Sequence, residues 1–262
     1  MINRRFFIAI GKRVIDFFYF LGGLANLTGQ CFYFMFTPPF KRRRVFEQAK
    51  KAGVDSLGIV ALVSLCIGFI FALQTAYFMQ RIGSELYIAS LVALSIVREL
   101  GPVITALVVA GRVGAAITAE LGSMQVTEQI DALEAFATNP IQYLVVPRFL
   151  ALSIMLPLLA VYANVIGIFG SYLICVYKLG ISSSLYISTT FDALKMKDLY
   201  TGLFKSLVFG MIISTVSCYE GFNVEGGAEG VGKATTRAVV KTFIMIIAAD
   251  CFFTALFYFI FP

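Results

Sequence analysis

Five long apolar stretches constrain this chain more than any other feature of its sequence. They lie near residues 57–80, 86–111, 144–177, 199–219 and 238–261. Each is at least as long as the roughly 20 apolar residues that an α-helix needs to cross a bilayer. Because lipid offers no partner for backbone N–H and C=O groups, such segments cross it as helices. The sequence therefore predicts an all-α integral membrane protein with five transmembrane helices.

The composition narrows the function further. Hydrophobic residues make up 59% of the chain and charged residues 14%, against about half and about a quarter in soluble domains. The sequence has no histidine, the residue that most often binds metals and acts as a general base. We therefore expect no catalytic site and no metal site. The net charge of +6 comes mainly from residues that flank the apolar stretches, which favours anionic lipid over nucleic acid as a partner.

The cysteines show no metal-binding or disulfide pattern. They are widely separated along the chain and none forms a Cys-x-x-Cys pair. We expect them to behave as small buried apolar residues; they are Cys31, Cys66, Cys175, Cys218 and Cys251.

The N-terminal residues 1–45 differ from the remaining residues, 46–262. They begin with basic residues but lack the uninterrupted apolar core of a signal peptide. Apolar residues recur at helical spacing, which predicts an amphipathic helix in the membrane interface, followed by the basic flank KRRR. The residues in that pattern are Phe6, Phe7, Ile10, Val14, Phe17, Phe18 and Leu21.

The distribution of Lys and Arg predicts the orientation. With the N-terminus inside, the inner segments hold fifteen basic residues and the outer segments five, with Arg98 inside a span. Cytoplasmic segments of membrane proteins carry the excess of Lys and Arg. The N-terminus is therefore expected in the cytoplasm, together with the segment between the second and third spans.

Arg98 and Glu99 lie inside the second apolar stretch, where charges are costly and usually functional. Adjacent residues on a helix point about 100° apart, so each needs a partner of its own. Pro102 removes the hydrogen bond to the Arg98 carbonyl and predicts a local kink. Two interpretations stay open: a polar lining of a substrate cavity, or structural ion pairs with Lys205 or Asp250.

A short acidic segment, TEQIDALEAFA, separates the second and third spans and ends at Asn139-Pro140. It predicts a polar helix outside the bilayer over 128–137, with Thr127 as its N-cap. Its apolar residues Ile130, Leu133 and Phe136 suit a partner's groove or a membrane surface. The helix is then either a docking element for a soluble partner or a solvated connector.

Residues 226–236, GGAEGVGKATT, partly match a phosphate-binding loop. Ala234 stands where that motif needs Ser or Thr, and the segment follows a membrane span rather than a soluble strand. We expect a flexible cytoplasmic loop that leads into the last span, and no nucleotide site.

The central run is the most specific part of the chain. LVALSIVRELGPVITALVVAGRVGAAITAELGSMQVTEQIDALEAFATNPIQYLVVPRF strongly resembles permeases of bacterial ABC lipid transporters of the MlaE (YrbE) type. ATTRAVV at 234–240, AADCFFTALF at 248–257 and Lys205 with Ser206 resemble the same family. The resemblance covers roughly residues 45–261.

This resemblance implies a permease domain over 46–262 in the bacterial inner membrane, working as a homodimer. It implies that phospholipid is the substrate and that a separate cytoplasmic ABC ATPase binds ATP-Mg, with no cofactor in this chain. A periplasmic MCE-domain hexamer and a STAS-domain accessory protein are further implied partners, and outer-membrane lipid asymmetry is the implied role.

The resemblance also implies roles for residues. Arg98 and Glu99 would line the lipid cavity, and Lys205 and Asp250 would belong to that lining or its support. The coupling helix between spans two and three would receive the ATPase stroke through Glu128, Gln129, Asp131, Ala132, Leu133 and Glu134.

Two other classes of function compete with this one. An ion-coupled secondary transporter or channel would use Arg98, Glu99 and Asp250, but the sequence shows no inverted repeat and five spans divide poorly into two halves. A membrane-embedded lipid enzyme would need a nucleophile or an acid–base set, and no such set stands out.

Overall fold

The computed structural model describes residues 2–37, 42–81, 83–84 and 87–260. These residues form helices joined by short turns and contain no strand. Five of the helical segments are long and apolar enough to cross a membrane, which confirms the prediction of an all-α membrane protein. The spans are Arg42–Arg81, Ile88–Val126, Ile141–Tyr177, Met196–Phe222 and Gly227–Phe259.

Several spans are built from more than one helical element. The first consists of α2 (Arg42–Ala52), a single 3₁₀ turn η1 (Val54–Ser56) and α3 (Leu57–Arg81). The elements that follow the first span are α4 (Ile88–Ser95), η3 (Ile96–Leu100), α5 (Gly101–Val109), η4 (Ala110–Gly114), α6 (Ala115–Val126), α7 (Gln129–Ala135), η5 (Ile141–Val145), α8 (Val146–Tyr177), α9 (Ser183–Ala193), α10 (Met196–Phe222) and α11 (Gly227–Ile260).

The helices are longer than the apolar stretches that predicted them. The second span contains 39 residues, which at 1.5 Å per residue extends about 58 Å. A bilayer core is only about 30 Å thick. The helices therefore continue beyond the membrane, and hydropathy alone marked only their apolar parts.

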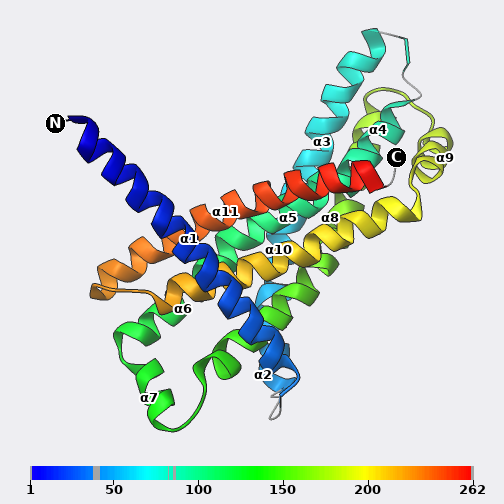
Figure 1. The fold of residues 1–262 in the computed structure, drawn as a ribbon. Helices are drawn as coiled ribbons and strands as arrows, with labels where there is room; N and C mark the ends of the chain where they lie inside the picture. The colour runs from blue at the N-terminus through cyan, green and yellow to red at the C-terminus, as the bar shows by residue number, and fades with distance from the viewer. Residues whose placement is uncertain (1, 38–41, 82, 85–86, 261–262) are drawn as a thin grey trace.

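Helix α8 is the centre of the bundle, with α3 on one side and α10 on the other (Figure 1). Small residues allow these close approaches, as expected when helices pack in lipid. A side chain on Gly68 of α3 would collide with the backbone of Gly167 in α8. The equivalent contact on the other side brings Gly210 of α10 against the Leu152 carbonyl.

Helix α1 (Ile2–Met35) crosses the outside of the bundle over α10 and α11 (Figure 1). Phe20 and Leu24 are buried against Val216 of α10, and the Phe20 ring meets Tyr219 edge-on at a centroid distance of 5.4 Å. Most of the residues that defined the amphipathic pattern have side chains outside the described part. Phe18 is exposed, on a surface that also presents Ile15.

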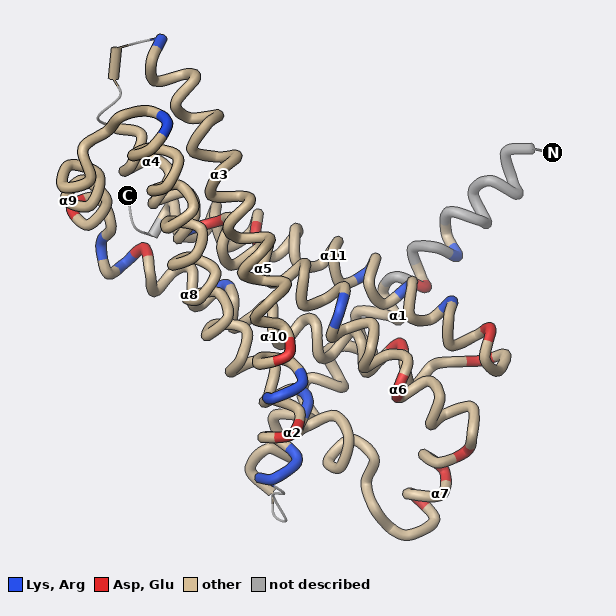
Figure 2. The backbone as a smooth tube through the Cα atoms, turned by 180° about the vertical axis from the view of Figure 1, so that it is seen from behind, with Lys and Arg blue, Asp and Glu red and all other residues tan. Residues whose placement is uncertain are grey.

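The bundle has two distinct ends. Helix α7 and the basic helix α2 lie at one end, and α9 lies at the other (Figure 1). Figure 2 shows the blue residues of α2 and the red residues of α7 at the same end. We call these the α7 end and the α9 end. The predicted orientation would place the α7 end in the cytoplasm.

The segment 226–236 is not a flexible loop, so that prediction is wrong. Gly226 and Gly227 make the turn with φ angles of 87° and 69°, and α11 begins at once. Lys233 pairs with Glu229 one turn earlier on the same helix, with Nζ 2.7 Å from Oε1. Gly230 and Gly232 lie within the first two turns of that helix.

Gly202 lets α10 approach η3, and it yields a stability prediction. A Cβ atom there would collide with the Val97 carbonyl oxygen, which belongs to backbone and cannot rotate away. We expect Gly202→Ala to lower the free energy of unfolding by about 1–3 kcal/mol. Thermal unfolding of the purified protein in detergent measures this change. Gly111→Ala is the control, since a Cβ there meets no atom within 4 Å; equal stability of the two variants would contradict the prediction.

Candidate functional site

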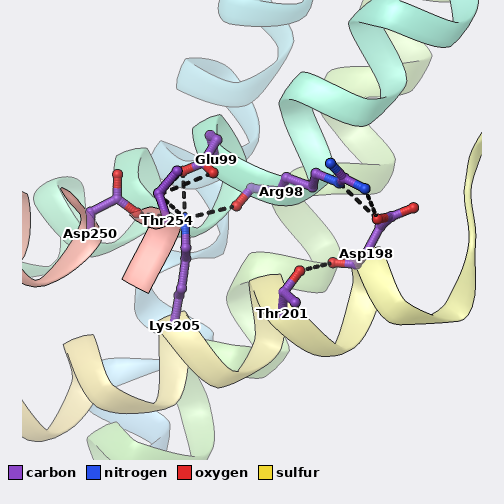
Figure 3. A network of polar contacts seen from close by, with 7 residues as sticks. All are labelled: Arg98, Glu99, Asp198, Thr201, Lys205, Asp250 and Thr254. Atoms are coloured by element: carbon purple, nitrogen blue, oxygen red, sulfur yellow. Dashed lines mark hydrogen bonds and ion pairs between the residues drawn. The ribbon is translucent and has the colours of Figure 1, made fainter. Parts of the chain in front are cut away.

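Two ion-pair clusters near the α9 end bring together η3, α10 and α11 (Figure 3). Asp198, Gly202 and Lys205 are spaced by four and three residues and therefore share one face of α10. All three are buried against η3, which carries Arg98 and Glu99. The neighbouring residues Arg98 and Glu99 find separate partners, as their geometry on a helix required.

Arg98 pairs with Asp198 at the N-terminus of α10. The Arg98 Nε donates to Asp198 Oδ1 at 2.7 Å, and Nη2 donates to the same oxygen. The other carboxylate oxygen accepts the backbone N–H of Lys195 at 3.0 Å, so Asp198 also caps its helix. The sequence analysis missed Asp198, although an acidic residue immediately before the predicted span at 199–219 was a visible signal.

Lys205 is the centre of the second cluster. Its ammonium carries three N–H donors, and these reach Glu99 Oε2 at 2.5 Å, Thr254 Oγ1 at 2.7 Å and the Arg98 carbonyl at 3.5 Å. Oδ1 of Asp250 lies 3.0 Å from Nζ, an electrostatic contact without hydrogen-bond geometry. Of the ion pairs that the structural alternative named, Glu99–Lys205 is therefore present. Arg98 pairs with Asp198 rather than with Asp250, and Asp250 lies against Lys205.

A proline explains why Lys205 turns toward the backbone. Pro102 has no N–H, so the Arg98 carbonyl four residues earlier loses its helical donor. The Lys205 ammonium lies close enough to replace that donor. The expected distortion takes the form of a π-helical turn, η3, in which the Gly101 N–H reaches back to the Ile96 carbonyl. Such turns often occur at functional sites.

The two clusters line one pocket of about 140 Å³. A larger apolar groove adjoins it and shares Lys197, Thr201 and Phe257 with it. The other residues of that groove include Tyr200, Phe204 and Leu207, all from α10. A small charged pocket beside an apolar groove is a suitable arrangement for an amphipathic molecule.

Helix α7, at the opposite end, carries the predicted docking residues. Leu133 is half-buried and the other five are exposed, which leaves their side chains available to a partner. The helix starts one residue after Glu128, which adopts a left-handed φ of 56°. The residues are Glu128, Gln129, Asp131, Ala132, Leu133 and Glu134.

Thr127 does not cap α7, so that prediction is wrong. Its hydroxyl donates to the Ser123 carbonyl at 2.8 Å, and Thr127 is instead the C-terminal cap residue of α6.

The apolar residues of the α7 segment divide into a buried part and an exposed part. Ile130 packs into the main core of the bundle, whereas Phe136 is 82% exposed. Ile130 therefore anchors the helix, and Phe136 is the apolar residue of this face that stays exposed.

An ion pair between a buried arginine and a half-exposed glutamate joins the two helices on either side of α7. Arg148 of α8 is buried, and its Nη2 lies 3.0 Å from Glu120 Oε2 of α6. Its Nη1 donates to the Leu144 carbonyl at 2.7 Å. Glu220 of α10 is likewise buried and pairs with Lys241 of α11 at 2.6 Å. The sequence analysis missed these pairs, because their members are 21 or more residues apart.

Helix α2 contacts the segment that follows α7. Pro147 leaves the Tyr143 carbonyl without its helical donor. Arg44 Nη1 donates to that carbonyl at 3.3 Å, and its guanidinium lies 3.3 Å from the centroid of the Tyr143 ring. Through these contacts of Arg44, a displacement of the segment around α7 would also shift the start of the first span.

The cysteines are free thiols. Cys31, Cys175 and Cys218 are buried as expected, but Cys66 and Cys251 are exposed on the outward faces of α3 and α11. Lipid surrounds the outward faces of membrane spans, so a cysteine that is exposed there still lies in an apolar environment. In the part of the chain that the structure describes, no group of three His, Cys, Asp or Glu residues could hold a metal ion.

Five apolar spans with charged networks inside the bundle define a multi-pass helical membrane protein. A family model described as Permease MlaE matches residues 45–256. The chain therefore belongs to the MlaE permease family, and it is a permease of the ABC-transporter class.

Relatives match over nearly the whole chain. A probable ABC transporter permease protein of Rickettsia felis is 42% identical over 250 residues, covering 95% of this chain and 96% of the relative. The intermembrane phospholipid transport system permease protein MlaE of Haemophilus influenzae is 35% identical over 255 residues, or 96% and 97%. The chloroplast protein TRIGALACTOSYLDIACYLGLYCEROL 1 of Arabidopsis thaliana is 40% identical over 216 residues, or 82% and 62%.

Proposed function

We propose that this chain is the membrane subunit of an ABC transporter that moves phospholipid between the bacterial inner membrane and a periplasmic MCE-domain hexamer. Residues 46–262 would form the permease domain and residues 1–45 an interfacial element. The observation that carries the proposal is the match, over 96% of this chain, to a permease of an intermembrane phospholipid transport system. Support for outer-membrane lipid asymmetry is the corresponding physiological role.

The charged pocket near the α9 end is the proposed lipid site. Arg98 and Glu99 are partly exposed and line the pocket, so they would contact the headgroup. Lys205 is buried beneath them and would hold Glu99 in place, and the largely buried Asp250 would in turn hold Lys205. The adjoining apolar groove suits acyl chains.

The exposed helix α7 is the proposed contact for a cytoplasmic ABC ATPase, which would bind ATP-Mg in its own chain. A homodimer and a STAS-domain accessory protein belong to the same proposal. When ATP closes the ATPases, α7 would move, and the Glu120–Arg148 pair would carry that movement into α6 and α8. ATP can drive this change only by binding one conformation more tightly than the other. The cavity would then narrow and release lipid to the MCE protein.

Co-purification tests the proposal directly. The permease is extracted from its host in mild detergent, proteins that stay bound are tested for ATPase activity, and the bound lipids are identified by mass spectrometry. We expect the ATPase and phospholipid to stay bound, and ATP-dependent lipid transfer after reconstitution into vesicles. A solitary chain that carries ions without an ATPase would instead support a secondary transporter.

A further inference from the structure

The two ion pairs that line the pocket present opposite charges to it. In the Arg98–Asp198 pair the cation is exposed, with side-chain exposures of 46% and 3%. In the Glu99–Lys205 pair the anion is exposed, with 38% for Glu99 and 1% for Lys205. Figure 3 shows the Arg98 guanidinium and the Glu99 carboxylate directed to different parts of the network. The pocket therefore has a positive side and a negative side.

The negative side carries an excess of charge. Lys205 is a single cation between two carboxylates, Glu99 and Asp250. The positive side has spare donors, because Arg98 gives Asp198 only two of its five N–H groups. Lys197 also lines the pocket and adds a cation there. A ligand that carries both a negative and a positive group would satisfy both sides.

We infer that this pocket selects a phospholipid headgroup that contains a phosphate and a primary ammonium, as in phosphoethanolamine. The inference rests on the proposed lipid-transport function and specifies its substrate class. The phosphate would lie against Arg98, whose planar guanidinium suits phosphate oxygens. The ammonium would lie against Glu99, with the Thr254 hydroxyl beside it.

Size and hydrogen bonding favour ethanolamine over other headgroups. The pocket holds about 140 Å³, well below the roughly 300–1,000 Å³ of pockets for drug-sized ligands, so it suits a small headgroup. A primary ammonium has three N–H donors for carboxylate and hydroxyl oxygens. The quaternary ammonium of choline has none. A glycerol headgroup brings no positive charge to the Glu99 side.

The test compares headgroups in competition. The permease–ATPase complex is reconstituted in vesicles with equal amounts of phosphatidylethanolamine, phosphatidylcholine and phosphatidylglycerol, then re-extracted, and the retained lipids are quantified by mass spectrometry. We expect phosphatidylethanolamine to be enriched about threefold to tenfold over each of the others. Equal retention, or more phosphatidylglycerol than phosphatidylethanolamine, would overturn the inference.

Variants locate the selectivity. Glu99→Gln should equalise retention of phosphatidylethanolamine and phosphatidylglycerol, whereas Glu99→Asp should keep the preference because it keeps the charge. Arg98→Lys should lower retention of all three lipids by a similar factor, because each contains phosphate. Glu229→Gln is the control, since Glu229 is exposed and paired with Lys233 near the start of α11; we expect it to change neither quantity.

The outcomes distinguish a failure of the headgroup assignment from a failure of the proposed lipid-transport function. If wild-type complex retains no phospholipid and transfers none, the proposed function fails and the headgroup assignment fails with it. If it transfers lipid without distinguishing headgroups, only the headgroup assignment fails. If Glu99→Gln does not fold, the wild-type competition and the Glu99→Asp variant still decide. A selectivity that persists in a folded Glu99→Gln protein would contradict the role of Glu99.

Discussion

Asp131→Lys is expected to abolish ATPase-dependent lipid transfer while the permease still folds and inserts. Asp131 is exposed on α7, so its replacement disturbs no core packing. The change reverses one charge on a surface that carries Glu128 and Glu134 nearby. A partner surface that complements these acids would then face a like charge, and such contacts suppress association. We expect the ATPase retained during purification to fall by about tenfold or more, a change of about 1.4 kcal/mol.

The measurement is the ratio of ATPase to permease after affinity purification, followed by lipid transfer in vesicles. Asp192→Lys is the matched control, because Asp192 is an exposed acid on α9 at the opposite end. It should leave the ATPase ratio unchanged. Normal ATPase retention and transfer by Asp131→Lys would show that α7 is only a connector.

Lys205→Met is expected to have the largest effect on stability. The substitution keeps a long side chain but leaves Glu99 and Asp250 without the ammonium that separates them. It also removes the donor that replaces the missing Pro102 N–H at the Arg98 carbonyl. Removing one partner of a buried ion pair typically costs about 3–5 kcal/mol. We expect a loss of that size in the free energy of unfolding.

Denaturant unfolding of the purified protein in detergent checks this loss. Lys178→Met removes an exposed lysine at the end of α8 and should be nearly neutral. A triple variant, Lys205→Met with Glu99→Gln and Asp250→Asn, should recover much of the stability because the uncompensated charges are gone. It should still fail to transfer lipid. Wild-type stability of the single Lys205→Met variant would contradict the central role of this ammonium.

Hydropathy predicted the spans well but their ends poorly. Crossing a bilayer needs a continuous apolar length, which is a local property of the sequence. The part of a helix that lies beyond the bilayer does not need to be apolar. The polar start of α11 was therefore predicted to be a loop. Thr127 failed as a cap for a related reason. Its hydroxyl could hydrogen-bond either to the end of α6 or to the start of α7, and in the structure it donates to the Ser123 carbonyl of α6.

Contacts between distant residues account for what sequence analysis missed in the site. Arg98 and Asp198 are separated by a hundred positions, and no local pattern links them. The expectation that Arg98 and Glu99 need separate partners followed from helix geometry alone. Which residues those partners are depended on the close approach of α10 to η3, which Gly202 permits.

The sequence by itself determined that five helices are long and apolar enough to cross a membrane, that Arg98 and Glu99 are costly inside one of them, and that a short acidic helix lies between two spans. These follow from apolar length, charge and helical period, which act along the chain. Only the tertiary structure decided that the exposed member of one ion pair is a cation and that of the other an anion. Burial of Asp198 and Lys205 against η3 sets that difference, and burial is a property of the packed bundle.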